Sequence, residues 1–374
     1  MKKVSIYVLS LNYGGAEKAI TNIANIISQF ATVSIKCIYK ISDNPYYQLD
    51  NNIKIEYLTN LKPNRNEFLD AIHSFRLIKA IKEGFKALKI LDLKRKVIIN
   101  SLKNDISDII LTTRKDHNYY LSKYARKGVI KIGQEHNDFA NEKDIRKVIK
   151  GAKNLDFFLP ASEFLTKKYQ ELLSGYQVNV CYIPHGICEY KIVHNKKEKQ
   201  IIAVGRLEKV KAFDDLLEAF SIIHSSAPEY KLVIAGDGSM KESLKDQARK
   251  LNIYDCVSFK GFLSEADLIK EYEKSELLVS TSRSESFGLV VIEAANIGVP
   301  TIAFSSANGF KEIIKNEENG YLIPNRDIKA LANKTIELLN DKESLKRIST
   351  NAKKSVSKYY NSNIKELWLN LINK

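Results

Sequence analysis

IIAVGRLEKVKAFDDLLEAFSIIHS, residues 201–225, is the stretch that is most informative about the fold. The apolar, β-branched run Ile201–Val204 predicts a buried strand, Gly205 begins a loop, and the apolar spacing over Asp214–Ser225 predicts an amphipathic helix. A strand that leads through a loop into a helix is the repeating unit of parallel sheets. The stretch therefore predicts an α/β protein.

The same alternation runs through the chain in two series of strands. The runs of the first series are Val4–Leu9, Val33–Tyr39, Ile53–Tyr57, Ile109–Thr112, Val129–Gly133 and Phe157–Pro160, and those of the second are Ile201–Val204, Lys231–Ala235, Val257–Lys260, Leu277–Ser280 and Thr301–Phe304. We expect two Rossmann-like domains, at residues 1–187 and 200–355, joined by a linker at 188–199. For residues 356–374 we expect a C-terminal helix that packs back on the first domain.

Composition limits the class of protein. The 374 residues fit two domains of typical size. Cys37, Cys181, Cys188 and Cys256 show no CxxC spacing, so we expect neither a zinc site nor a disulfide framework. The apolar run Val4–Leu11 is too short for a typical signal peptide and favours a buried first strand. The sequence has no run of roughly 20 apolar residues, so it predicts no membrane-spanning helix. We expect a cytoplasmic location.

The net charge of +15 falls mostly in residues 1–190. Such a surplus indicates an anionic partner, either a membrane surface, a phosphate-bearing acceptor or nucleic acid, unless it only reflects a Lys-rich proteome. Nucleic acid is disfavoured because no recognition motif appears.

Residues 76–96 read RLIKAIKEGFKALKILDLKRK, a basic amphipathic pattern. This helix either lies on an anionic membrane, which would place the protein at the inner face of the plasma membrane, or covers the sheet with its apolar face. The apolar positions that share one face are Leu77, Ile78, Ile81, Phe85 and Leu88, and the candidate membrane contacts are Lys79, Lys82, Lys86 and Lys89.

Two loops after predicted strands carry residues suited to phosphate. Gly14 and Gly15 let the backbone approach a ligand and open a helix whose N-terminal amides suit phosphate, although a tight turn would need the same glycines. The loop is not GxGxxG, so nicotinamide binding gains no support. Arg206 and Lys211 follow the strand at 201–204 and could grip two phosphates, or they are solvated surface cations.

A third loop, ESFGLVVIEAANIGVP at residues 285–300, is the most specific signal. Glu285 precedes a predicted helix and Glu293 lies inside it. The amides of Phe287, Gly288 and Leu289 would form a cradle for phosphate or hydroxyl groups at the helix start. Carboxylates suit sugar and ribose hydroxyls because each accepts several hydrogen bonds. The alternative is a Glu285 that caps the helix and a Glu293 on the surface.

Together these motifs resemble the retaining glycosyltransferases of family 4, of the bacterial surface-polysaccharide type. That family has the GT-B fold, two facing Rossmann-like domains with a cleft between them. The resemblance rests on these residues and segments: Glu285 with Glu293, Gly205–Lys211, Gly14–Glu17, Ala235–Gly238, Glu312–Ile314 and Gly320–Leu322. The match covers nearly the whole C-terminal half, but in the N-terminal half only the first loop and Glu135-His136-Asn137. Asn296 departs from the family's usual methionine-type residue, and the acceptor region matches nothing.

The resemblance implies a role for each matching residue. Glu293 would hold the ribose hydroxyls, Glu285 the donor sugar, and the amides of Phe287–Leu289 the sugar and the β-phosphate. Arg206 and Lys211 would neutralise the diphosphate, and Gly14 and Gly15 would close over it. Lys260, Gly261 and Phe262 would contact the base. His136 would lie near the reacting centre, or it could be a satisfied interior histidine.

The resemblance also implies the reaction. A hexose or N-acetylhexosamine would pass from a nucleotide diphosphate sugar, with UDP expected, to a glycan or lipid-linked acceptor in cell-surface polysaccharide synthesis. The anomeric configuration would be retained by front-face displacement, since no carboxylate nucleophile is obvious. No DxD-type pair follows a strand, so we expect no metal and no other cofactor. The alternatives are a GT-B-like epimerase or phosphorylase, and a catalytically silent nucleotide-sugar-binding partner of another transferase.

Overall fold

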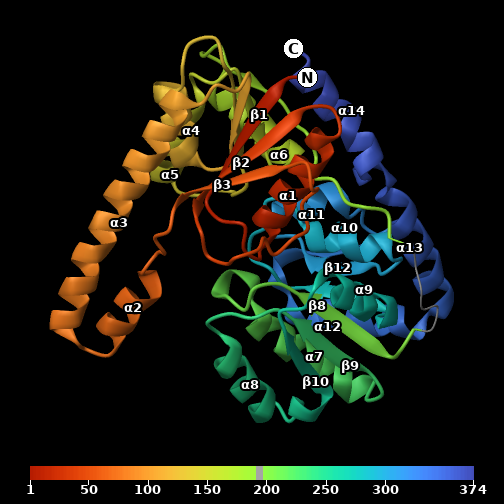
Figure 1. Cartoon of the computed structure of the whole chain (residues 1–374). Helices are drawn as coiled ribbons and strands as arrows, with labels where there is room; N and C mark the ends of the chain where they lie inside the picture. The colour runs from red at the N-terminus through yellow and green to blue at the C-terminus, as the bar shows by residue number, and fades with distance from the viewer. Residues whose placement is uncertain (191–196) are drawn as a thin grey trace. The chain divides into compact units, whose positions relative to one another are not determined.

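The computed structural model describes residues 1–190 and 197–374 (Figure 1). The chain divides into unit 1, which contains Met1–Gly186 and Ile364–Lys374, and unit 2, which contains Ile187–Asn363. The division falls one residue before the expected end of the first domain at 187. Residues 191–196 of the expected linker lie outside the described residues.

Unit 1 is built on a seven-stranded parallel sheet in the order β3-β2-β1-β4-β5-β6-β7. Its strands are β1 (Lys3–Val8), β2 (Thr32–Tyr39), β3 (Lys54–Thr59), β4 (Ile109–Thr112), β5 (Ile130–Glu135), β6 (Phe157–Pro160) and β7 (Asn179–Val180). The first six confirm the predicted strands within two residues, whereas the two-residue β7 was not predicted. The strand order reverses at β1, so the loops after β1 and β4 leave the carboxyl edge where doubly wound sheets bind ligands.

Helices cover both faces of this sheet because alternate side chains of each strand point to opposite faces. Ile6 of β1 packs in one core with Trp368 near the C-terminus, and Tyr7 packs in the other with Ile98 and Leu121. Trp368 is fully buried in unit 1. The helices are α1 (Gly15–Ser28), α2 (Arg65–His73), α3 (Leu77–Asn104), α4 (Lys115–Tyr124), α5 (Glu142–Ala152), α6 (Glu163–Leu172) and α14 (Asn361–Ile372).

The long helix α3 is longer than the 76–96 pattern and is buried over its C-terminal half, where Ile90, Ile98 and Leu102 enter the unit. Its N-terminal half extends beyond the sheet with α2 beside it (Figure 1). The apolar side chains there are exposed, Ile78 by 87% and Phe85 by 65%, so the interpretation in which this face covers the sheet is wrong. Among the described residues, every helix is too short or too polar to cross a lipid bilayer.

Unit 2 has a six-stranded parallel sheet in the order β10-β9-β8-β11-β12-β13. The strands are β8 (Gln200–Val204), β9 (Lys231–Ala235), β10 (Val257–Gly261), β11 (Leu277–Ser280), β12 (Thr301–Phe304) and β13 (Gly320–Ile323), of which only β13 was not predicted. The helices are α7 (Phe213–Ser226), α8 (Lys241–Lys250), α9 (Glu265–Lys274), α10 (Leu289–Asn296), α11 (Asn308–Ile313), α12 (Ile328–Asn340) and α13 (Lys342–Ser355). The strand order reverses between β8 and β11, which is the expected ligand position in this unit.

Candidate active site

The loops after β8 and β11 meet at the point where the strand order of unit 2 reverses. The hydroxyl of Thr281 donates to the carbonyl of Ala212 at 2.7 Å, and the amide of Arg283 donates to the carbonyl of Val210 at 2.8 Å. These hydrogen bonds hold the stretch with Arg206 and Lys211 against the stretch with Glu285. The fold therefore brings together two motifs that lie more than 70 residues apart in sequence.

Lys211 and Glu285 form an ion pair between these two loops. Ser282 Oγ donates to the same carboxylate oxygen, Glu285 Oε1, at 2.9 Å. Helix α10 has no side-chain cap, so the interpretation of Glu285 as a capping residue is wrong. Lys211 is only 18% exposed and is paired, so it is not a solvated surface cation.

Arg206, in the same loop as Lys211, is exposed. Within the described part of the chain, its guanidinium has no hydrogen-bond or ion-pair partner. A guanidinium presents five N–H donors in a planar fork, which matches the oxygens of a phosphate. Arg206 is thus a cation available to an anionic ligand at the carboxyl end of β8.

The start of α10 offers backbone donors beside Glu285. Gly288 has φ of 113°, and a Cβ there would lie 2.8 Å from the ring of Phe310, so only glycine fits. The amides of Gly288 and Leu289 donate to no other group in the described residues, as is usual for the first turn of a helix. The predicted helix start is confirmed, and the donors suit phosphate or hydroxyl oxygens.

Glu293 lies inside α10 and is only 3% exposed, so the interpretation of a surface Glu293 is wrong. The hydroxyl of Tyr272 donates to Glu293 Oε2 at 3.4 Å. Burial, and next the Glu293 carboxylate, raises the pKa of Tyr272 well above its usual value. Tyr272 therefore stays a neutral donor that orients the carboxylate, a role for which the sequence held no signal.

The loops after β9 and β10 are fixed by close backbone packing. A Cβ on Gly236 would lie 1.9 Å from the carbonyl oxygen of Gly205, which explains the glycine in Ala235–Gly238. The amide of Gly236 donates to the carbonyl of Gly261 at 2.7 Å. Phe262 follows β10 and is 41% exposed, and Lys260 Nζ lies 3.6 Å from Glu271. These residues lie at the same carboxyl edge as Arg206, two strands away from β8.

A second pair of loop anchors was not predicted. Arg326 forms an ion pair with Asp215 of α7 and donates to the carbonyl of Ser282 at 3.3 Å. Arg283 Nη2 lies 3.6 Å from the same aspartate. These contacts hold the β11 loop, but their partners are far apart in sequence, and no local pattern indicates them.

In unit 1, Gly14 is the N-cap of α1, and its amide donates to the hydroxyl of Tyr47 at 3.4 Å. Gly14 has φ of 149°, a backbone conformation that side-chain-bearing residues rarely adopt, so the local backbone favours glycine there. Tyr46 and Tyr47, for which no role was predicted, pack edge to face with ring centroids 5.0 Å apart. Gly14 and Gly15 are thus at the carboxyl edge of the first sheet, as predicted from the strand before them.

His136 follows β5, and its ring stacks on that of His185 at 5.2 Å between centroids. Burial, and then the charge of Arg114, lowers the pKa of His136 to about 4, so its imidazole is neutral near pH 7. Its Nε2 is enclosed and has no hydrogen-bond partner in the described residues, which is not the environment of a satisfied interior histidine.

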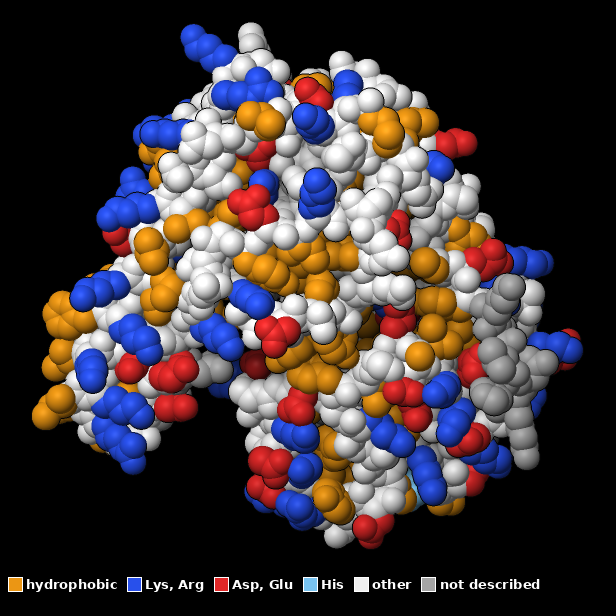
Figure 2. All heavy atoms as spheres, in the orientation of Figure 1, with side chains coloured by type: hydrophobic (Ala, Val, Ile, Leu, Met, Phe, Trp, Pro, Cys, Tyr) orange, Lys and Arg blue, Asp and Glu red, His pale blue; other side chains and the backbone are white. Residues whose placement is uncertain are grey.

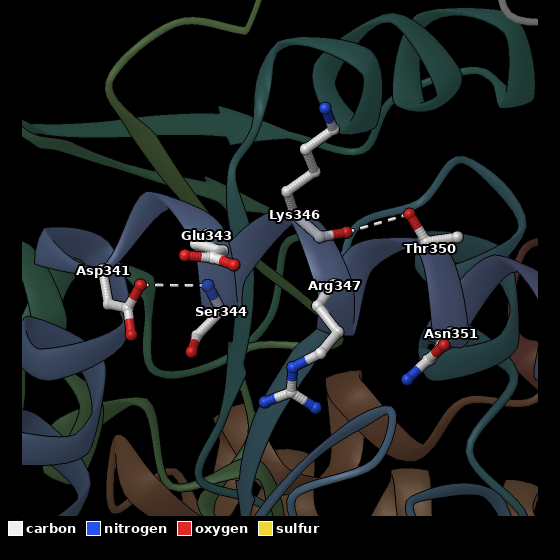
Figure 3. A pocket seen from close by; sticks show the side chains of 7 residues that line it. All are labelled: Asp341, Glu343, Ser344, Lys346, Arg347, Thr350 and Asn351. Atoms are coloured by element: carbon white, nitrogen blue, oxygen red, sulfur yellow. Dashed lines mark hydrogen bonds between the residues drawn. The ribbon is translucent and has the colours of Figure 1, made fainter.

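Within the described ranges, no group of three or more His, Cys, Asp and Glu side chains gathers as a metal site would require. A hollow on α13 is lined by one helix alone, from Asp341 to Asn351 (Figure 3). It contains none of the predicted site residues, and no other element brings functional groups to it.

Comparison with known proteins agrees with this geometry. Residues 189–355 match the family described as glycosyl transferases group 1. An alpha-1,4-N-acetyl-D-galactosaminyltransferase of Campylobacter jejuni, named for the acceptor GalNAc-alpha-(1->4)-GalNAc-alpha-(1->3)-diNAcBac-PP-undecaprenol, is 28% identical over 100% of this chain and 98% of its own. A poly(glycerol-phosphate) alpha-glucosyltransferase of Bacillus subtilis is 30% identical over 58% of this chain and 33% of its own.

Among solved structures, Staphylococcus aureus TarM, in complex with fondaparinux, alpha-GlcNAc-glycerol and UDP, matches with a TM-score of 0.81 at 18% identity, over 100% of both chains. The fold is therefore that of the GT-B glycosyltransferases, with two Rossmann-like parallel-sheet domains. The chain is a glycosyltransferase.

Proposed function

We propose that unit 2 binds a nucleotide diphosphate sugar, with UDP as the expected nucleotide, at the carboxyl edge of its sheet. The observation that carries this proposal is the junction of the two loops, where Lys211 of the β8 loop pairs with Glu285 of the β11 loop. The β8 loop also carries Arg206, whose guanidinium has no partner among the residues that the structure describes. A bound diphosphate would attract both cations, and sugar hydroxyls would donate to Glu285. The amides of Gly288 and Leu289, which donate to no group in the described ranges, add donors for the β-phosphate.

The other predicted residues have supporting roles in this proposal. Glu293, oriented by Tyr272, would accept hydrogen bonds from the ribose hydroxyls. Lys260, Gly261 and Phe262 would meet the base, since Phe262 offers an exposed ring for stacking. In unit 1, Gly14, Gly15 and the neutral imidazole of His136 are the candidate contacts to the reacting groups.

For the chemistry we propose transfer with retention of the anomeric configuration and without a metal. The bond from the anomeric carbon to the phosphate oxygen breaks, and the acceptor oxygen bonds to the same face of that carbon. The proton of the acceptor hydroxyl passes to the departing phosphate oxygen. Arg206 and Lys211 would stabilise the charge that develops on the diphosphate, at roughly 3–4 kcal/mol for each preorganised donor. The alpha linkages in the names of the two relatives support retention.

We propose a hexose or N-acetylhexosamine as the transferred sugar, and a cell-surface glycan or lipid-linked glycan as the acceptor. The named relatives act on an undecaprenol-linked glycan and on a glycerol-phosphate polymer. The N-terminal half of α3 supports a location on the cytoplasmic face of the membrane. Its exposed apolar stripe, which includes Ile78, Ile81 and Phe85, is combined with four exposed lysines that suit anionic lipid headgroups: Lys79, Lys82, Lys86 and Lys89.

A donor screen tests the proposed function. Thermal unfolding of the full chain with UDP-, GDP- and ADP-sugars would identify the donor by its stabilisation. Incubation of that donor with phosphate-linked glycans, followed by mass spectrometry and NMR, should give an alpha-linked product. Donor binding without turnover on any acceptor would indicate a catalytically silent partner, and conversion of the donor sugar without an acceptor would indicate an epimerase.

A further inference from the structure

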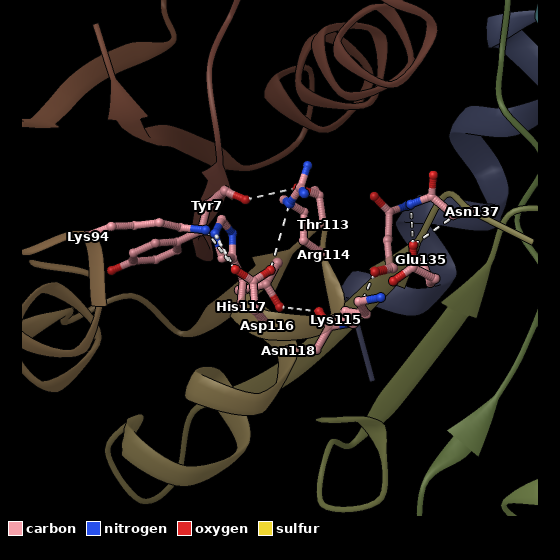
Figure 4. Close-up of polar contacts among 12 residues, drawn as sticks. Tyr7, Lys94, Thr113, Arg114, Lys115, Asp116, His117, Asn118, Glu135 and Asn137 are labelled. Carbon is pink, nitrogen blue, oxygen red and sulfur yellow. Dashed lines mark hydrogen bonds and ion pairs between the residues drawn. The ribbon is translucent and has the colours of Figure 1, made fainter. Parts of the chain in front are cut away.

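A pocket of about 620 Å³ lies in unit 1, at the carboxyl ends of β4 and β5. Helix α4 is anchored there by a buried polar chain: Thr112 Oγ1 lies 2.6 Å from Asn118 Oδ1, and Asn118 Nδ2 donates to the carbonyl of Gln134 at 3.0 Å. Figure 4 shows the polar side chains of this edge coming from β1, α3, the start of α4, the end of β5 and the loops after β4 and β5. The lining residues are Arg114, Lys115, Asp116, Tyr119, Glu135, Asn137, Phe139, Lys147 and Lys150.

Cations outnumber carboxylates in this pocket. Asp116 is shared by Lys94 Nζ at 2.7 Å and Arg114 Nε at 3.7 Å. Asp144 is likewise shared by Lys115 at 2.7 Å and Lys147 at 3.6 Å. Each of these carboxylates neutralises one charge of the two cations beside it, so an anion is attracted to the pocket.

Lys150 adds a further positive charge to the same wall. Its Nζ lies 4.9 Å from the ring centroid of Tyr119, and it has no carboxylate partner in the described part of the chain. Lys115 Nζ lies 3.8 Å from the ring centroid of Phe139. The wall thus presents ammonium groups next to partly exposed aromatic rings, a combination that suits a ligand with an anionic group and an apolar ring face.

Glu135, at the carboxyl end of β5, offers a hydrogen-bond acceptor to the pocket. Its side chain is 1% exposed, and Oε1 accepts from the amide and the side chain of Asn137 at 3.1 and 2.7 Å. The other oxygen, Oε2, is buried and has no partner in the described residues, although the residue lines the pocket. Burial raises the pKa of Glu135, against the hydrogen bonds from Asn137 and the charge of Arg114. A buried oxygen without a partner is costly, and a ligand hydroxyl would satisfy it.

We propose that this pocket binds the acceptor through a hydroxyl-bearing sugar or polyol that carries a phosphate group. The phosphate would contact the lysines of α5, Lys147 and Lys150, and a hydroxyl of the sugar or polyol would bond to Glu135 Oε2. The inference rests on the proposed function, since it names the acceptor class of that transfer. Two sources carry this chemistry, a diphosphate-linked lipid glycan and a polyol-phosphate polymer.

Binding to the full chain, measured by calorimetry without donor, tests the pocket. The probes are glucose 1-phosphate, methyl glucoside and inorganic phosphate. We expect glucose 1-phosphate to bind more tightly than either fragment, and Lys147→Glu with Lys150→Glu to weaken it by about tenfold or more, because charge-assisted hydrogen bonds are lost. The matched control is Lys143→Glu with Arg146→Glu, exposed residues of α5 that do not line the pocket.

Each outcome bears on the proposal. Equal binding in the pocket and control variants, or inorganic phosphate binding as tightly as glucose 1-phosphate, would overturn it. A short-prenyl diphosphate sugar and a glycerol-phosphate oligomer then separate the two sources. The one that represents the true acceptor should bind more weakly to the Lys147→Glu, Lys150→Glu variant than to the wild type. If the affinity of neither compound falls in this variant, the assignment is contradicted. A wild-type chain that binds no nucleotide sugar would refute the proposed function instead, since the probe measurement needs no donor.

Discussion

The two cations after β8, Arg206 and Lys211, differ in their exposure and in whether they are paired with a carboxylate. Lys211 is held by the Glu285 carboxylate, which also accepts a hydrogen bond from Ser282, whereas Arg206 is exposed without a partner in the described residues. Arg206 is therefore ready to bind an anion, and Lys211 must exchange its carboxylate for the ligand. Both would act on the same departing diphosphate.

Arg206→Ala and Lys211→Ala should each lower turnover by roughly a hundredfold or more, because their interactions strengthen as the charge develops. The double variant should cost less than the sum of the single losses, and Arg206→Lys should not rescue fully. Steady-state kinetics measure this, with Lys209→Ala, an exposed cation of the same loop, as the control. Near-normal turnover in Arg206→Ala would remove the main support for the mechanism.

Glu293 lies buried behind the loop that carries Glu285. We predict that Glu293→Ala weakens donor binding more than it slows the chemical step, because ribose contacts are the same in the ground and transition states. Donor titration and single-turnover rates separate the two effects, and Tyr272→Phe should show a smaller loss of affinity because it removes only the orienting hydrogen bond. A large fall in rate with unchanged donor affinity would contradict this assignment.

His117 is fully buried in α4, and neither of its ring nitrogens has a hydrogen-bond partner in the described residues. Burial lowers its pKa to about 3, against the attraction of Asp116. The unfolded chain therefore binds a proton that the folded chain excludes. As a result, this histidine does not lower the free energy of unfolding above about pH 6.5, and lowers it increasingly as the pH drops from there towards 3. From pH 7.5 to pH 5 this histidine alone should cost about 2 kcal/mol of unfolding free energy.

Urea unfolding at the two pH values measures this loss. In His117→Leu, the loss of unfolding free energy between pH 7.5 and pH 5 should be smaller by about 2 kcal/mol, the contribution of this histidine. Equal pH dependence in the wild type and the variant would show that His117 does not titrate as its burial implies.

At the scale of elements, α3 is one helix with two environments. Its C-terminal half is fixed in unit 1 by Ile98, Leu102 and the ion pair of Lys94 with Asp116. Its N-terminal half exposes apolar side chains among lysines, as the orange and blue atoms of the projecting lobe show in Figure 2. Such a stripe is unfavourable in water and favourable at a lipid interface.

We predict that replacing Lys79, Lys82, Lys86 and Lys89 with Gln reduces binding to anionic vesicles, at about 1 kcal/mol for each lost charge. Vesicle co-sedimentation of the full chain at several lipid concentrations measures the change. The control variant carries the same change at exposed lysines of unit 1 outside α3, namely Lys54, Lys123, Lys127 and Lys167. Vesicle binding that is equal in both variants would show that α3 is only a surface helix.

At the scale of the whole molecule, the charges proposed to replace a metal are basic side chains and helix amides. We predict that EDTA leaves transfer activity largely intact, because Arg206 and Lys211 supply the electrostatic stabilisation of the diphosphate. Product formation with and without EDTA measures this. Complete loss that magnesium or manganese restores would show that the reaction depends on a divalent cation.

The sequence by itself determined the strands, the α/β class and the loops that carry the site. Strands such as β4, β6, β11 and β12 are short, β-branched or aromatic runs buried on both faces, and this pattern is local. β7 was missed because two residues, Asn179 and Val180, carry no strand pattern, and β13 because its apolar run covers only the last three of its four residues. The loop motifs were readable because glycine and charged residues directly follow predicted strands.

Only the tertiary structure decided which residues of these loops meet and which are buried. The pairing of Lys211 with Glu285, the burial of Glu293 beside Tyr272, and the exposure of the apolar stripe on α3 depend on contacts across long sequence separations. The same holds for the pocket at Glu135, whose cations come from α4 and α5. Local patterns carry backbone preferences, whereas burial and charge pairing arise only when distant segments pack together, so the chemistry of each site residue was settled by the fold.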